Sequence, residues 1–210
     1  LQGVDTATFY DSEGDDNFYA GPGLGQMKGV NYVNRAEGFT YINAYATTGK
    51  DLAILVDSKG NDILISGPNA TLMQSASGWY KNMLFAFKNI EASASDGYDV
   101  ATLLDTPGKD VFIGTPTYSI LYSSDFTTEA GGFDRVNTVS RAGDDEAYLY
   151  DSANNDQVTL SGTTGLLNLG GSVVQFTNYG YVALYGTAGG VNRRSVNRVA
   201  FLVDWNGSWV

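Results

Sequence analysis

Eight aspartates stand in four pairs along the chain, and the two members of each pair are five residues apart. The pairs lie in the segments DSEGDDNFYAGP, DSKGNDILISGP, DTPGKDVFIGTP and DSANNDQVTLSG. Carboxylate oxygens suit hard cations such as calcium, whereas zinc and copper sites are usually built from Cys and His, which this sequence lacks. The candidate calcium ligands are Asp11, Asp16, Asp57, Asp62, Asp105, Asp110, Asp151 and Asp156.

The same segments also suit a purely structural role as turns. Asp at the first position and Gly at the fourth are typical of a type I turn, and Asp and Ser side chains can accept hydrogen bonds from nearby amides. We expect Gly14, Gly60 and Gly108 to adopt a positive φ, and their fourth counterpart is Asn154, a residue that tolerates this conformation. Carboxylates aligned on successive units repel unless they are hydrogen-bonded or bridged by a cation. Turn capping and calcium binding therefore both remain open.

The aspartate pairs belong to a longer repeat, in which the first aspartate recurs every 46 to 48 residues. In every copy an Asp stands six residues before it, an Ala four before it and a large apolar residue two before it. Ala200, Leu202 and Asp204 fit the opening of a fifth copy, which places additional residues ahead of it. We therefore expect one repeat domain over 1–210, with units of about 1–49, 50–97, 98–143 and 144–190 and a partial unit over 191–210.

The composition and patterning predict an all-β fold. The chain has 26 Gly, and apolar residues alternate in short segments without a helical period. We expect a parallel β-solenoid (β-helix) of about four units, with two coils per unit; the alternative is a β-propeller with one blade per unit. A propeller must close into a ring, so four units and an incomplete fifth favour the solenoid. In one stack, two columns are expected: Ala7, Ala53, Ala101 and Ala147, and Phe9, Leu55, Leu103 and Leu149.

The whole unit, AxLxDSxGxDxFxGxPT, resembles tandem β-repeat units of very large bacterial secreted or cell-surface proteins. The clearest copy is DVATLLDTPGKDVFIGTPTYSILYSSDF. This resemblance implies an extracellular or cell-surface β-helical module, and no catalytic residue is carried over from it. Gly14, Asp16 and Phe18 and their counterparts more weakly resemble the calcium-binding β-roll repeat of RTX proteins, which implies calcium between coils. Here Asp-Ser replaces the Gly-Gly of that repeat, and the period is not nine residues.

The acidic net charge of the chain makes some classes of binding partner unfavourable. The net charge is −11, which disfavours nucleic acid and anionic membranes, and no apolar run reaches the length that spans a bilayer. The chain opens at Leu1 inside a repeat, so we expect it to be a processed or excised piece of a longer protein.

The favoured function is that of a non-enzymatic, extracellular structural or self-assembling module, such as a filament, surface scaffold or adhesive. One alternative is a carbohydrate-binding module, since 13% of the residues are aromatic and Trp79 and Tyr80 are adjacent. The other is a β-helical polysaccharide lyase, whose chemistry Lys, Arg, Tyr and carboxylates can perform without His.

The two ends of the chain suggest how copies could meet. A solenoid without caps exposes unpaired strand edges, which are templates for another chain. The first unit is acidic, whereas the last residues are basic and aromatic. We therefore expect head-to-tail contact with another copy or with flanking repeats, through Arg193, Arg194, Arg198, Trp205 and Trp209.

Overall fold

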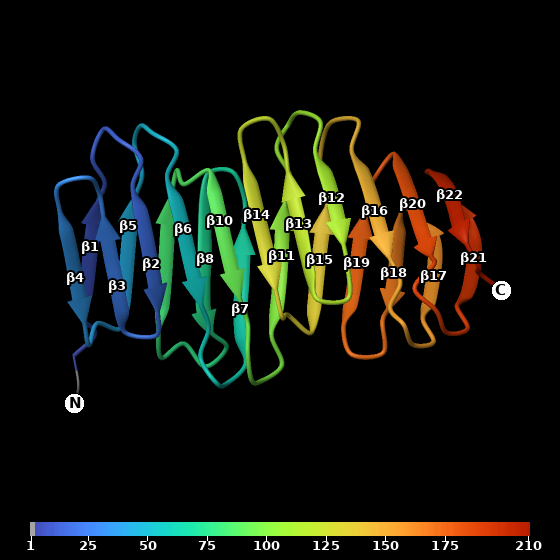
Figure 1. The fold of residues 1–210 in the computed structure, drawn as a ribbon, viewed down its shortest axis with the longest axis horizontal. Helices are drawn as coiled ribbons and strands as arrows, with labels where there is room; N and C mark the ends of the chain where they lie inside the picture. Colours follow the sequence, from blue (N-terminus) through green and yellow to red (C-terminus); the bar gives the residue numbers. More distant parts are fainter. Residues whose placement is uncertain (1–2) are drawn as a thin grey trace.

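A computed structural model describes residues 3–210 as an all-β solenoid, a flattened rod made of two facing sheets (Figure 1). Each sheet has 11 strands, and the described residues contain no helix, so none that could cross a membrane. Strands stack along the rod instead of forming blades around an axis, so the solenoid prediction is confirmed and the propeller alternative is excluded.

The strands are short, mostly of five residues. The first two units contain β1 (Thr6–Tyr10), β2 (Asn17–Gly21), β3 (Leu24–Lys28), β4 (Val33–Glu37), β5 (Tyr41–Tyr45), β6 (Leu52–Val56), β7 (Asp62–Ser66), β8 (Ala70–Ser75), β9 (Lys81–Phe85) and β10 (Asn89–Ser93). The next two contain β11 (Val100–Leu104), β12 (Val111–Gly114), β13 (Tyr118–Tyr122), β14 (Thr127–Gly131), β15 (Arg135–Val139), β16 (Glu146–Tyr150), β17 (Gln157–Gly162), β18 (Thr164–Asn168), β19 (Val173–Thr177) and β20 (Tyr181–Gly186). The chain finishes with β21 (Arg193–Val199) and β22 (Leu202–Gly207).

Each unit crosses between the two sheets an odd number of times. In unit one, β1 lies in the first sheet, β2, β3 and β4 form an antiparallel meander in the second, and β5 returns to the first. The chain then crosses again to β6, so unit two begins in the second sheet. Opening strands therefore alternate, with β1 and β11 in the first sheet and β6 and β16 in the second. The expected arrangement of two coils per unit is wrong.

This alternation also overturns the predicted columns of alanines and of large apolar residues. Ala7 and Ala101 lie in one sheet, and Ala53 and Ala147 lie in the other. The same division separates Phe9 and its counterparts. Instead, each of the three later alanines stands beside a large residue of the preceding unit, and the pairs are Phe18 with Ala53, Leu64 with Ala101, and Phe112 with Ala147. All six side chains are completely buried, so small residues accommodate large ones across the strand boundary.

The fifth unit has a different register from the one expected. β21 pairs in parallel with β17, and Arg194 stands opposite Val158. Arg194, Val196 and Arg198 therefore occupy the positions that Ala147, Leu149 and Asp151 hold in unit four. Ala200, Leu202 and Asp204 do not open the unit, because β22 pairs with β20 instead. The sequence pattern did not reveal the start of the fifth unit, because two arginines stand where the repeat has its alanine and its first aspartate.

The C-terminal residues cover the end of the core. The Arg194 guanidinium lies 4.8 Å from the centre of the Trp205 ring, and the Trp205 and Trp209 rings are 5.9 Å apart. Trp209 is only 7% exposed. The Val210 amide donates to the Asn192 carbonyl, and the Val210 carbonyl accepts from the Arg194 amide. The expectation of an uncapped end with Trp209 available for contact is therefore wrong.

Candidate cation sites between the coils

The aspartate pairs bracket the turns where the chain passes from the first to the second strand of a unit. A third residue joins each pair from the start of the next unit, and in three of the four sites it is a carboxylate within 4.8 Å of the other two. The sites are numbered along the chain: site 1 is Asp11, Asp16 and Asp51; site 2 is Asp57, Asp62 and Asp99; site 3 is Asp105, Asp110 and Asp145; site 4 is Asp151, Asp156 and Asn192. The spacing predicted each pair but not its third member. The sequence did contain a signal for the third member, because an aspartate stands six residues before the first aspartate of the following unit.

The second aspartate of each pair holds its own turn closed. In site 2, Asp62 Oδ2 accepts from the Ser58 amide at 3.1 Å and from the Ser58 hydroxyl at 2.7 Å. The Tyr80 hydroxyl donates to Asp62 Oδ1 at 2.6 Å. Asp62 is 1% exposed, so this carboxylate is satisfied entirely by buried or partly buried donors. Ser or Thr follows the first aspartate in all four sites and makes the same contacts.

The first and third aspartates tie neighbouring parts of the stack together. Asp57 Oδ2 accepts from the Ser95 amide at 2.6 Å, and Asp57 Oδ1 accepts from the Ser95 hydroxyl at 2.8 Å. Asp99 Oδ1 accepts from the Asp62 amide at 2.7 Å. Both partners lie more than 35 residues away in sequence. The predicted hydrogen bonding by the first aspartate is present, but its donors lie in the next coil and are not the amides that directly follow it in sequence.

The positive φ falls on a different glycine from the one expected. Gly60 has no positive φ, whereas Gly97 in the following loop has a φ of 130°. A Cβ atom on Gly97 would lie 2.5 Å from the Gly60 carbonyl oxygen, so the two turns pack backbone against backbone. The prediction for Gly14, Gly60 and Gly108 is therefore wrong, because coil stacking sets the constraint; the positive values are found at Gly49, Gly97, Gly143 and Gly190.

In sites 3 and 4 a side-chain nitrogen also donates to the first aspartate, in addition to the backbone amide that reaches it in every site. In site 4, the Asn192 side-chain amide donates to Asp151 Oδ2 at 2.9 Å, and Asn192 Oδ1 accepts from the Asp156 amide at 3.2 Å. In site 3, Arg141 Nε lies 2.9 Å from Asp105 Oδ1 as an ion pair. Sites 1 and 2 have an aspartate in the place of Asn192. None of the ion pairs among residues 3–210 involves the acidic groups of these two sites.

One carboxylate oxygen in site 2 is left without a hydrogen-bond partner. Asp99 is 0% exposed, and its Oδ2 atom has no hydrogen-bond partner within the described residues. Burial, together with the nearby charges of Asp57 and Asp62, raises the pKa of the Asp99 carboxyl to about 6, although the hydrogen bond from the Asp62 amide lowers it. An unpaired buried carboxylate is costly, so this atom needs a proton or a cation.

In site 3 the second aspartate, Asp110, has an oxygen without a donor, and the reason differs from that in site 2. Tyr32 and Tyr80 stand just before β4 and β9 and donate to the second aspartates of sites 1 and 2. The residue just before β14 is Phe126, which has no hydroxyl. Asp110 Oδ1 is accordingly buried without a partner, and burial raises the pKa of the Asp110 carboxyl.

Replacing Phe126 by Tyr is therefore expected to stabilise the protein. The new hydroxyl would donate to Asp110 Oδ1, as Tyr80 does to Asp62, and raise the free energy of unfolding by about 1 kcal/mol. Urea denaturation of the wild type and of Phe126→Tyr measures the difference. An equal gain in an Asp110→Ala background would show that the hydroxyl does not act through Asp110.

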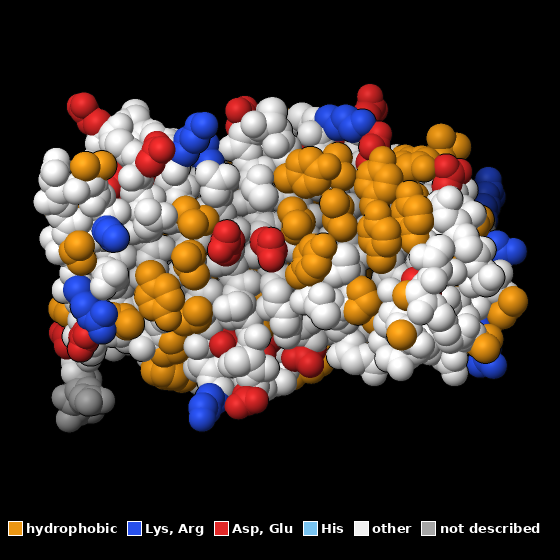
Figure 2. All heavy atoms as spheres, in the orientation of Figure 1, with side chains coloured by type: hydrophobic (Ala, Val, Ile, Leu, Met, Phe, Trp, Pro, Cys, Tyr) orange, Lys and Arg blue, Asp and Glu red, His pale blue; other side chains and the backbone are white. Residues whose placement is uncertain are grey.

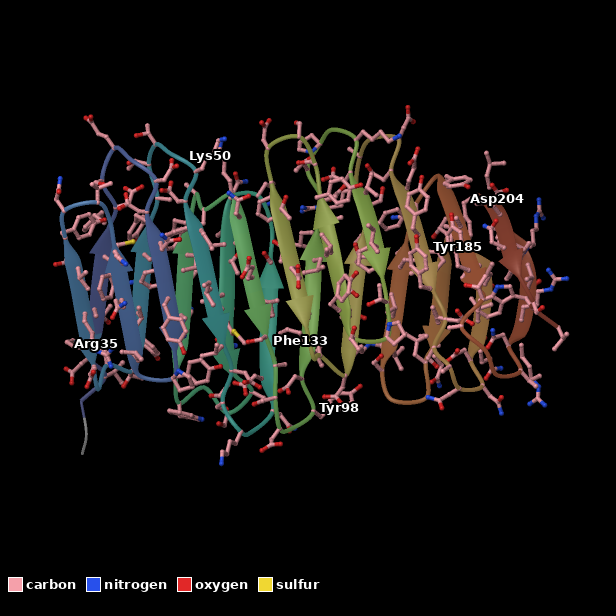
Figure 3. The ribbon with its side chains drawn as sticks, in the orientation of Figure 1. Arg35, Lys50, Tyr98, Phe133, Tyr185 and Asp204 are labelled. Carbon is pink, nitrogen blue, oxygen red and sulfur yellow. The ribbon has the colours of Figure 1, made fainter. Side chains whose placement is uncertain are left out.

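Tyrosines gather on the outer face of the second sheet. Figure 2 shows apolar side chains clustered over β12, β13, β16 and β20, and Figure 3 labels Tyr185 on this face. The Tyr150 and Tyr185 rings stack with centres 4.7 Å apart and planes 9° from parallel. Because stacked rings hide the faces that would lie against a sugar, this pair serves better as a cross-strand support than as a sugar platform. Tyr80 is buried, and its neighbour Trp79 is exposed.

Comparisons with protein-family models, with curated proteins and with solved structures found no match.

Proposed function

We propose that this chain is a non-enzymatic structural module of an extracellular or cell-surface assembly, and that it extends by contact between strand edges. The observation that carries this proposal is the direction of the edge strands. The first sheet ends on β1 and β21, and the second on β4 and β22. In each sheet the two edge strands run in the same direction, because an even number of antiparallel pairings separates them. Added coils or a second copy could therefore continue both sheets without a reversal.

The two ends differ in how open they are. At the N-terminal end, β1 and β4 flank an open hollow lined in part by Phe9, Tyr10 and Val33. At the C-terminal end, Val210 pairs with the start of β21, and Arg194 takes a position that faces the core in other units. Inward-pointing charge and a covered edge disfavour strand addition. Association is therefore expected to begin at β1 and β4. Substituting the arginines that the sequence predicted as contacts tests whether copies meet head to tail.

A proline in β1 tests this proposal. The Asp5 carbonyl accepts from Tyr41 and the Asp11 amide donates to Tyr45, so the amides of even-numbered residues such as Thr8 point away from β5. Thr8→Pro removes a free amide from the exposed edge while the bonds to β5 are kept. We expect self-association, measured by light scattering against concentration, to weaken about tenfold or more.

A companion variant separates the possible arrangements. Arg193→Glu combined with Arg198→Glu weakens association if the contact is head to tail, and leaves it unchanged if only the N-terminal ends meet. A wild-type chain that stays monomeric at high concentration and low salt contradicts the proposed assembly. Circular dichroism of each variant confirms that the fold is retained.

A further inference from the structure

The unpartnered oxygen of site 2 points to a ligand that the protein itself does not supply. Asp57, Asp62 and Asp99 each offer an oxygen within 4.8 Å of the others, and Asp99 Oδ2 is buried without a donor. Hydrogen bonds already hold the three carboxylates in place. The three carboxylates are therefore held close together, while one oxygen of Asp99 lacks any hydrogen-bond donor.

Site 4 shows what the protein does when it fills this position itself. Asn192 is 3% exposed and uses its amide nitrogen to bond Asp151, while its oxygen keeps the bond to the Asp156 amide. Asp99 accepts from the equivalent Asp62 amide but has no nitrogen with which to reach Asp57. One asparagine thus replaces a carboxylate and supplies a donor at the same point.

Site 3 supplies donors to its first and third aspartates in another way, although Asp110 Oδ1 remains buried without a partner. Arg141 bonds Asp105 through its backbone amide at 2.5 Å and through its side chain at 2.9 Å. The Ser140 hydroxyl donates to Asp145 Oδ2 at 2.6 Å, so the third aspartate is satisfied as well. The protein supplies a positive charge here that sites 1 and 2 lack.

Site 1 shares the arrangement of site 2. Asp51 Oδ1 accepts from the Asp16 amide at 2.9 Å, and Asp51 is 5% exposed. Within the described residues, no side chain donates to its other oxygen. The Tyr32 hydroxyl donates to Asp16 Oδ1 at 2.9 Å, as Tyr80 does to Asp62 in site 2.

We propose that sites 1 and 2 each bind one calcium ion between neighbouring coils, and that sites 3 and 4 bind none. Calcium fits because it takes oxygen ligands in irregular geometry. Magnesium fits less well, since it demands a near-ideal octahedron. The first aspartates, Asp11 and Asp57, are half-buried, so water can complete the coordination shell from outside. This inference does not depend on end-to-end association of the rods.

Calcium titration of the chelator-treated full chain tests the stoichiometry. Isothermal titration calorimetry at neutral pH is expected to give two equivalents, with dissociation constants no weaker than about 1 mM. Calcium should also raise the melting temperature by several degrees, because it binds the folded state alone, and magnesium should raise it less. A wild-type chain that takes up no calcium in this range overturns the proposal.

Three variants assign the sites. Asp99→Asn reproduces the side chain of site 4 and is expected to reduce the stoichiometry to one, with the fold kept because the new amide can donate to Asp57. Asn192→Asp is expected to add an equivalent, and it tests the same rule by gain if Asp99→Asn fails to fold. Asp96→Asn removes an exposed charge of the same unit and should change nothing. Two equivalents retained in Asp99→Asn, or no gain in Asn192→Asp, contradict the assignment.

Discussion

Gly97→Ala is expected to lower the free energy of unfolding by about 3 kcal/mol or more. Gly97 has a φ of 130°, which an alanine adopts only with strain, and the added Cβ would lie 2.5 Å from the Gly60 carbonyl oxygen. That oxygen belongs to backbone, so it cannot rotate away as a side chain could. Relief requires the two turns to separate, and separation would pull Asp57 from the Ser95 amide. Urea denaturation measures the loss.

Gly78→Ala is the matched control in the same unit. Gly78 also has a positive φ, of 77°, but an added Cβ meets nothing within 4 Å. The control carries only the conformational strain, about 1 to 2 kcal/mol. The difference between the two variants therefore reports the close approach of the turns together with the greater backbone strain of a φ near 130°. Equal losses would mean that the turns do not pack against each other as described.

The sequence predicted the elements of the fold because their signals are local. Alternating apolar residues marked the strands, and the recurring aspartates marked the turns and the unit length. The alternation between sheets could not be predicted in this way. It depends on how often each unit crosses the rod, and that depends on three strands such as β2, β3 and β4 staying in one sheet as a meander. Nothing in the alternation of side chains distinguishes a turn within a sheet from a crossing between sheets.

The candidate sites show the same division between local and long-range information. The Asp57 and Asp62 pair is local, and the spacing identified it. Asp99 joins the pair only because unit three begins beside the turn of unit two. The fifth unit was misplaced because Arg194 and Arg198 no longer resemble the residues whose positions they hold. In that unit only the strand pairing, and not the residue types, preserves the repeat.

Asp62→Ala is expected to destabilise the protein by on the order of 3 kcal/mol, because three donors lose their acceptor. These donors are the Ser58 amide, the Ser58 hydroxyl and the buried Tyr80 hydroxyl. The free energy of unfolding is measured in chelator, so that loss of a bound cation does not contribute. Asp96→Ala, which removes an exposed carboxylate nearby, should stay within about 0.5 kcal/mol of the wild type.

A double-mutant cycle with Tyr80→Phe identifies the share of this effect that passes through the tyrosine. Tyr80→Phe alone is expected to cost about 1 to 3 kcal/mol, since it deprives Asp62 Oδ1 of its donor. The double variant should lose less than the sum of the two single losses by at least about 0.5 kcal/mol, because both remove the same hydrogen bond. Strict additivity would show that Tyr80 and Asp62 act independently. The second aspartate would then close its turn through Ser58 alone, and the missing hydroxyl at Phe126 would have no bearing on site 3.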